Sequence, residues 1–273
     1  MFLKPNTIEE LIINQLKNGP KKNIDLVNFI IDKKNGTKQG VYKALRKLKV
    51  EEIITTHKNE TSLSGVWIKK MSDFFAVTQF HYKQPITASG FLSLSQGQKI
   101  SFSLKTLTEL DIFSSHAFYL LNQIIPKDRP IFAFNYHQWF YYGRQENDEF
   151  LSREIKRQKQ PLLLLLGNDN ILDFEVKKIY NQNNSQCHIL EKELFPHNYY
   201  FNILDDFLIE FNLDKKITNL LDKFFNKHKK FDESAQEELK SIITLRSNNK
   251  MTISRNTTKI EKLKKQFKKY FVY

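Results

Sequence analysis

The stretch Thr37-Lys-Gln-Gly-Val-Tyr-Lys-Ala-Leu-Arg-Lys-Leu48 decides what the first part of the chain folds into. Its apolar residues recur at helical spacing behind a threonine that can serve as N-cap. The apolar positions are Val41, Ala44, Leu45 and Leu48. The pattern predicts a helix that buries one face. Because the opposite face carries Lys, Arg, Gln and Tyr, we expect an amphipathic helix with a basic outer surface.

Two helices are predicted before this stretch and a β-hairpin after it. The first helix covers 7–17, with Thr7 as N-cap, and the second begins with Asn23 as N-cap and ends near residue 36. Short β-branched runs at 53–56 and 66–68 enclose a polar turn and predict two strands. Three helices followed by a hairpin is the element order of a winged helix-turn-helix, whose third helix enters the major groove of DNA.

Residues 1–70 are therefore expected to be a winged-helix DNA-binding domain, and the quoted stretch is similar to the recognition helix of many bacterial and archaeal regulators. These residues hold fourteen Lys and Arg against seven Asp and Glu, a charge that attracts phosphates. The candidate DNA-binding residues are Thr37, Lys38, Gln39, Tyr42, Lys43, Arg46, Lys47 and Lys58. The alternative is a protein-interaction module whose basic face is only solvated.

The rest of the chain is predicted to comprise three parts. Residues 71–109 lose the helical period and alternate between polar and apolar side chains, which predicts a β-rich connector. Residues 110–230 alternate between helical and strand patterns, which predicts an α/β domain with a partly parallel sheet. Residues 231–273 are expected to be a helical basic tail that docks on its own protein with its Lys face aiding DNA binding.

The segment Leu208-Ile-Glu-Phe-Asn-Leu-Asp-Lys-Lys-Ile-Thr-Asn-Leu-Leu-Asp-Lys-Phe-Phe225 is similar to the closing strand and helix of TrmB-type transcriptional regulators. The resemblance implies a winged helix joined to an α/β effector domain related in fold to phospholipase D, which senses a sugar or other small ligand. The chain departs from that family in its β-rich connector, where the family has a long coiled helix. It also lacks the His-x-Lys phosphodiesterase signature, so a ligand is expected to be bound rather than cleaved.

A ligand site is predicted where the strand at 130–135 gives way to the helix at 145–158. Ligands of α/β sheets bind at such strand ends, and a polar-aromatic cluster lies there. Its candidate ligand-binding residues are Tyr142, Arg144 and Glu146. The alternative is that the aromatic side chains belong to a core and that the acidic ones complement the helix dipole.

Composition narrows the compartment and the chemistry. A net charge of +13 favours a polyanionic partner, either nucleic acid or an anionic membrane surface, although a Lys-rich genome bias is an alternative source. The single Cys187 excludes a disulfide framework and, with seven dispersed His, leaves no zinc-ligand spacing. No signal peptide or membrane span is indicated, so we expect a cytoplasmic protein with neither metal nor cofactor.

The combined prediction is a DNA-binding transcriptional regulator, not an enzyme, that forms a homodimer on double-stranded DNA and has a small-molecule effector as a further candidate partner. One alternative is a metal-dependent nuclease that uses Asp173, Glu175 and Lys177 to hold Mg²⁺ and orient a water. The helical spacing around Asp173 argues against it, because such residues ride on a strand in that chemistry. Another alternative is an RNA-binding or antitoxin-like interaction module.

Overall fold

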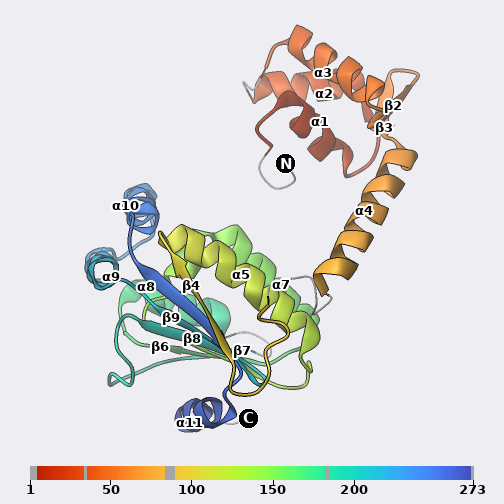
Figure 1. Ribbon diagram of the computed structural model, residues 1–273. Coiled ribbons are helices and arrows are strands. Elements are labelled where there is room, and N and C mark those ends of the chain that lie inside the picture. The colour runs from red at the N-terminus through yellow and green to blue at the C-terminus, as the bar shows by residue number, and fades with distance from the viewer. Residues whose placement is uncertain (1–4, 34–35, 84–89, 182–184, 272–273) are drawn as a thin grey trace. The chain divides into compact units, whose positions relative to one another are not determined.

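The computed structural model describes residues 5–33, 36–83, 90–181 and 185–271. Two compact units emerge, unit 1 over Met1–His81 and unit 2 over Tyr82–Tyr273, and each is described by itself (Figure 1). Both units combine helices with a sheet around a hydrophobic core of their own, so the chain is a mixed α+β protein. Within the described residues, none of the helices has the length and apolar character needed to span a membrane.

Unit 1 contains three short helices, a small sheet and one long helix. The helices are α1 (Ile8–Leu16), α2 (Asn23–Asp32), α3 (Lys38–Val50) and α4 (Gly65–Lys83), and the strands are β1 (Lys21–Lys22), β2 (Ile54–His57) and β3 (Glu60–Leu63). The strands form an antiparallel sheet of order β1-β3-β2. The first three helices pack around Ile12, Ile30 and Leu48, each at most 1% exposed.

Two of the three predicted helix caps are confirmed. The hydroxyls of Thr7 and Thr37 each accept a hydrogen bond at 3.2 Å from the backbone amide three residues ahead. The prediction for Asn23 is wrong, because α2 already includes this residue and Lys22 occupies the N-cap position. The Asn23 side chain instead accepts a hydrogen bond from the Thr61 hydroxyl at 2.5 Å, which fastens the start of α2 to β3.

The second strand of the hairpin lies earlier in the chain than predicted. Strand β2 turns into β3 through Lys58 and Asn59, whose φ angles of 47° and 65° suit a two-residue hairpin turn. The predicted strand at 66–68 is wrong, since these residues form the beginning of α4. The Ser64 hydroxyl accepts a hydrogen bond from the backbone amide of Trp67 at 3.4 Å, and this capping contact favours a helix start over the local β preference.

The β-rich connector predicted over 71–109 is also wrong. Helix α4 continues to Lys83, and residues 84–89 lie outside the described residues. In the described part of this segment the only strand is β4 (Lys99–Leu104), and α5 (Leu107–Ile124) follows it. Apolar side chains occur on several sides of α4, so its sequence lacks the one-sided period by which an amphipathic helix is detected.

Unit 2 is built on a seven-stranded sheet of order β4-β10-β9-β8-β5-β6-β7. The remaining strands are β5 (Ile131–Asn135), β6 (Leu162–Leu166), β7 (Ser185–Ile189), β8 (Tyr199–Leu204), β9 (Phe207–Asn212) and β10 (Asn249–Ser254). Strands β5, β6 and β7 are parallel, while every other neighbouring pair is antiparallel. The prediction of a partly parallel sheet is confirmed.

Helices cover both faces of the middle of this sheet (Figure 1). The helices of unit 2, in addition to α5, are α6 (Trp139–Gly143), α7 (Gln145–Arg157), α8 (Ile171–Tyr180), α9 (Lys215–Lys227), α10 (Glu233–Thr244) and α11 (Thr257–Phe267). On one face Ala133 and Leu164 pack with Ile155 of α7, and on the other Phe132 contacts Phe267 of α11 with ring centroids 5.2 Å apart. Burial on both faces explains why β6 consists of five leucines.

The helical basic tail predicted for 231–273 is wrong as a separate part. Strand β10 lies inside the sheet between β4 and β9, and α11 places Ile260, Leu263 and Phe267 in the core of unit 2. The expected docking of this segment on its own protein is confirmed. Lys259 pairs with Glu210 at 2.5 Å, so part of the basic charge of this segment is neutralised within unit 2.

Candidate functional site

Helix α3 separates apolar from basic side chains in the way its sequence predicts. Its four apolar positions are at most 8% exposed and face α1 and α2. All eight candidate DNA-binding residues have exposed side chains: Thr37 at the N-cap, six from α3, and Lys58 at the tip of the hairpin. The structure therefore presents these side chains on the surface of unit 1, where a large ligand can reach them.

The outermost row of α3 consists of Gln39, Lys43 and Arg46. They follow one another at intervals of four and three residues, which aligns side chains along one face of a helix. The buried residues of α3 lie on the opposite face, so this row projects directly away from the core. A capped helix packed on two others holds the row rigidly, which suits recognition of a regular partner surface.

Tyr42 and Lys58 mark one flank of this row. They line a common cleft with the start of α2, including Lys22 and Asn23. Tyr42 is 37% exposed, and its ring forms part of the cleft wall. The fold thus joins the side of α3 to the hairpin tip, two segments that the sequence separates by sixteen residues.

Lys47 marks the other flank, where α3 meets α1. Its Nζ lies 3.3 Å from the Glu9 carboxylate. Backbone hydrogen bonding at Glu9, helped by Lys47 and Lys43, lowers the pKa of that carboxyl below its ordinary value. Because the lysine is 59% exposed, the pair contributes at most about 1 kcal/mol, and the Lys47 side chain can exchange Glu9 for another anion.

Unit 2 contains a chain of hydrogen-bonded acidic and imidazole groups that no sequence pattern indicated. His137 lies two residues after the end of β5, and its Nδ1 lies 2.8 Å from Asp173 Oδ2, while its Nε2 lies 3.2 Å from Asp222 Oδ1. The other Asp222 oxygen lies 2.9 Å from His197 Nδ1, and His197 Nε2 lies 2.8 Å from Glu193 Oε1. The chain runs from fully buried His137 and Asp173 outward to Glu193, which is 66% exposed.

The hydrogen bonds in this chain favour charged groups. Burial alone would lower the pKa of His137, but its bonds to Asp173 and Asp222 outweigh that effect and raise the pKa. The pKa of His197 is raised for the same reason, through Asp222 and Glu193. For Asp222, burial opposes ionisation, yet the bonds from both imidazoles hold its pKa below the ordinary value. The two histidines and Asp222 therefore stabilise each other as ions.

The same geometry indicates that these hydrogen-bonded side chains have a structural role and do not form a ligand site. His137 is 0% exposed and stacks on Phe225 with ring centroids 4.3 Å apart, so a ligand cannot contact its ring. Asp173 also accepts a hydrogen bond from the backbone amide of Gln138 at 2.8 Å. These contacts join the end of β5 to α8 and α9. Distant residues meet here because α/β folds gather side chains at the carboxyl ends of parallel strands.

The three residues of the nuclease alternative do not converge. Asp173 is 0% exposed and engaged as just described, whereas Glu175 is exposed and pairs with Lys178 at 2.9 Å. Lys177 extends over the ring of Phe174, 5.9 Å from its centroid. All three lie on helix α8, as their spacing predicts, and Glu175 lies on a different face of it from Asp173 and Lys177.

The candidate ligand residues of unit 2 separate in the structure. The Tyr142 hydroxyl donates to the Leu172 carbonyl oxygen at 2.9 Å, and its ring packs in the core. Arg144 pairs with Asp111 at 3.2 Å, and Asp111 lines a cavity of about 100 Å³ beneath α5 and α7. The side chain of Glu146 lies outside the described residues. A pocket thus exists near Arg144, and neither Tyr142 nor Arg144 is among the residues that line it.

No protein-family model matches the chain, and no curated protein matches it either.

Proposed function

We propose that this protein is a sequence-specific DNA-binding transcriptional regulator whose unit 1 is a winged helix-turn-helix. The order α1-β1-α2-α3-β2-β3 supports the proposal, because winged-helix proteins insert the third helix into the major groove and touch the backbone or minor groove with the hairpin. The observation that carries it is the outward row of Gln39, Lys43 and Arg46 on a capped and packed α3.

Each side chain has a role that follows from its chemistry. Arg46 can donate two parallel hydrogen bonds to guanine, and Gln39 can pair with adenine through its amide. Lys43 at the middle of the row, and Lys38 and Lys58 beside it, can neutralise phosphates on the two strands that border the groove. Thr37 and Tyr42 offer hydroxyls at the start and the flank of α3.

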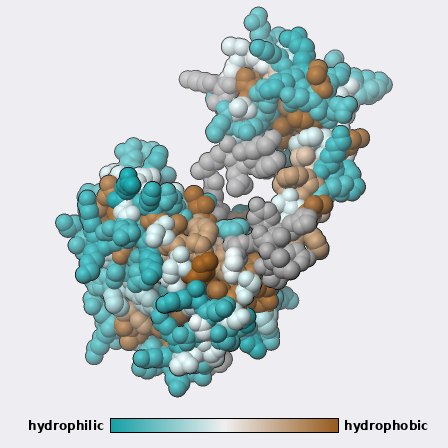
Figure 2. Space-filling model, viewed as in Figure 1, coloured by the Kyte–Doolittle hydropathy of each residue, from teal (hydrophilic) through white to brown (hydrophobic). Residues whose placement is uncertain are grey.

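The proposal includes a homodimer held by α4. Val66, Phe74 and Val77 are 62%, 59% and 58% exposed and fall within about 80° of each other around the helix axis, with the exposed Lys70 inside the same arc. Figure 2 shows the resulting band of brown and tan atoms along this helix. Exposed apolar stripes of this length are typical of protein interfaces, and a second copy of α4 offers a matching stripe. A dimer would bind DNA more tightly than a monomer, because its two α3 helices would contact two half-sites.

Unit 2 is proposed to bind a small-molecule effector, as the effector domains of TrmB-type regulators do. The cavity beside Arg144 supports this role. The long helix α4 also supports the resemblance. The TrmB-type family has a long helix between its domains, and the sequence pattern had predicted a β-rich connector here instead. A cytoplasmic location remains part of the proposal.

The test is binding of the purified protein to duplex DNA from upstream of its own gene, compared with unrelated duplex over a series of salt concentrations. We expect Arg46→Ala to weaken specific binding by about 5- to 150-fold, the value of one bidentate base contact. Lys43→Ala should weaken binding to both duplexes and reduce the salt slope by about one. Lys240→Ala removes the same charge from an exposed position of α10 and serves as the matched control.

Three outcomes would overturn the proposal. Equal, weak and steeply salt-dependent binding to every duplex would show that the basic charge acts without sequence recognition. Tighter binding to single-stranded RNA than to any duplex would favour the RNA-binding alternative. Specific binding that Arg46→Ala and Lys240→Ala reduce alike would remove α3 from the recognition surface.

A further inference from the structure

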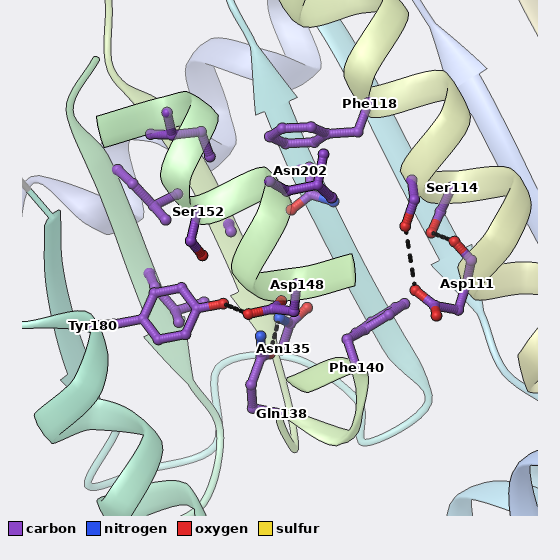
Figure 3. A pocket seen from close by; sticks show the side chains of 16 residues that line it. Asp111, Ser114, Phe118, Asn135, Gln138, Phe140, Asp148, Ser152, Tyr180 and Asn202 are labelled. Atoms are coloured by element: carbon purple, nitrogen blue, oxygen red, sulfur yellow. Dashed lines mark hydrogen bonds between the residues drawn. The ribbon is translucent and has the colours of Figure 1, made fainter. Parts of the chain in front are cut away.

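The cavity of unit 2 lies between α5, α7 and the face of the sheet that carries Asn135 and Asn202 (Figure 3). Its volume is about 100 Å³. An apolar cavity of about 150 Å³ holds benzene, so by proportion this one accommodates about four non-hydrogen atoms. Most of the exposed lining surface is apolar, and Asp, Asn, Ser and Tyr side chains add polar groups to it, which indicates a ligand with both a hydrocarbon part and a hydrogen-bonding group.

The lining is negatively charged. Asp111 and Asp148 both face the cavity, and the lining contains no Lys, Arg or His among the described residues. Asp111 is compensated from behind by Arg144. Asp148 accepts a hydrogen bond from the Tyr180 hydroxyl at 2.5 Å, but no described cation pairs with it. Burial raises the pKa of both carboxyls to about 6, so a positive charge in the cavity would relieve a real electrostatic cost.

Amide groups add further acceptors. Asn135 is 6% exposed and donates through its Nδ2 to Gln138, while its Oδ1 accepts from no described residue. Asn202 projects from β8 into the same space, and its side chain forms no hydrogen bond with any described residue. Both amides line the cavity, so their oxygen atoms can accept hydrogen bonds from a ligand there.

Two aromatic rings complete the lining. Phe118 projects from α5 and Phe140 from α6, and both rings line the cavity beside the polar groups (Figure 3). A ring face attracts a cation and also accommodates a short hydrocarbon chain. The Asp148 carboxylate has no cationic partner among the described residues, and amide oxygens and aromatic rings line the same cavity. Together these groups suit an ammonium group, which is cationic and only donates hydrogen bonds.

We propose that this cavity binds a small primary organic amine, with its ammonium group held by Asp148 and by the Asn135 and Asn202 amides, and its short carbon chain against Phe118. A metal ion fits less well, because the described residues include no group of three or more His, Cys, Asp or Glu placed to hold one. The inference deepens the effector-binding part of the proposed function and is independent of DNA binding.

The test is titration of n-propylamine into the full chain at neutral pH, followed by calorimetry and ligand-observed NMR, with 1-propanol as a neutral ligand of the same size. A ligand of four non-hydrogen atoms binds no tighter than roughly 10⁻⁵ M. We expect the amine to bind at least about tenfold more tightly than the alcohol, the effect of one charge-assisted hydrogen bond. Asp148→Asn should remove most of this preference.

Glu237→Gln, on the exposed surface of α10, is the matched control and should change nothing. Circular dichroism checks that each variant folds. If Asp148→Asn does not fold, Asn202→Leu, which keeps the volume of a half-buried side chain, should weaken amine binding in its place. Equal affinity for amine and alcohol, preferential binding of glycerol, or full amine binding by both variants would overturn the inference. A failure of DNA binding in the separate duplex assay would leave this result unaffected.

Discussion

At the scale of single residues, Asp222 is the link that ties His137 to His197. It is 24% exposed, and removing its charge would leave the buried His137 ring with a weaker partner. We expect Asp222→Asn to lower the free energy of unfolding of unit 2 by about 1–3 kcal/mol, the range for a disturbed buried hydrogen bond. Urea unfolding followed by circular dichroism measures this loss. Glu193→Gln, at the exposed end of the same chain, should cost under about 1 kcal/mol.

The same residue predicts how stability depends on pH. Histidines whose pKa is raised by folding stabilise the protein below their unfolded pKa of about 6.5, and this contribution is lost as pH rises through the folded value. The pKa of Asp222 is lowered, so its ionised carboxylate stabilises the folded protein above about pH 4, and this contribution is lost as the pH falls through the folded pKa. The stability that His137, His197 and Asp222 contribute together is therefore greatest between about pH 4 and 6.5. In Asp222→Asn the decline above pH 6.5 should be shallower, and an unchanged slope would contradict the assigned ion pairing.

At the scale of elements, α4 yields a prediction about assembly. Val77→Lys places a charge within the exposed apolar stripe, at its C-terminal end, so it should shift a dimer toward monomer by at least tenfold in dissociation constant. Sedimentation velocity over a range of concentrations measures the shift. Gln79→Lys adds the same charge on the far side of the helix and should leave the association unchanged. Identical behaviour of the two variants would place the interface elsewhere.

Elements were predictable where a single local pattern was sufficient. Helix α3 has both a cap and a one-sided apolar stripe, and β6 has five leucines, so each appears where the sequence indicates. Residues 66–68 favour a strand locally but become helix because Ser64 caps them. In β10, Met251 and Ile253 alternate with polar residues, a strand signal that the surrounding lysines obscured. The His137 chain joins residues up to 85 positions apart, which no local pattern can reveal.

At the scale of the whole molecule, the segment after Asn248 is structural. A chain ending at Asn248 lacks β10 and α11, and thereby an interior strand and the buried Ile260 and Phe267. We expect unit 2 of this variant to lose its cooperative unfolding transition. The free energy lost by exposing the strand edges and the core residues is greater than the usual free energy of unfolding of a domain. Unit 1, which has a core of its own, should retain helical circular dichroism. A truncated chain that still unfolds cooperatively as a whole would contradict this role.

The position of β10 also has a consequence for synthesis. Strand β4 emerges from the ribosome about 145 residues before β10, which is its only partner among the described strands of the sheet. At roughly 5–20 residues per second that delay lasts on the order of 10 s. Unit 1 is complete much earlier and can fold during the wait. The nascent protein thus passes through a stage in which unit 1 is folded while unit 2 still has an unpaired strand edge. Such an edge can pair with another strand or bind a chaperone.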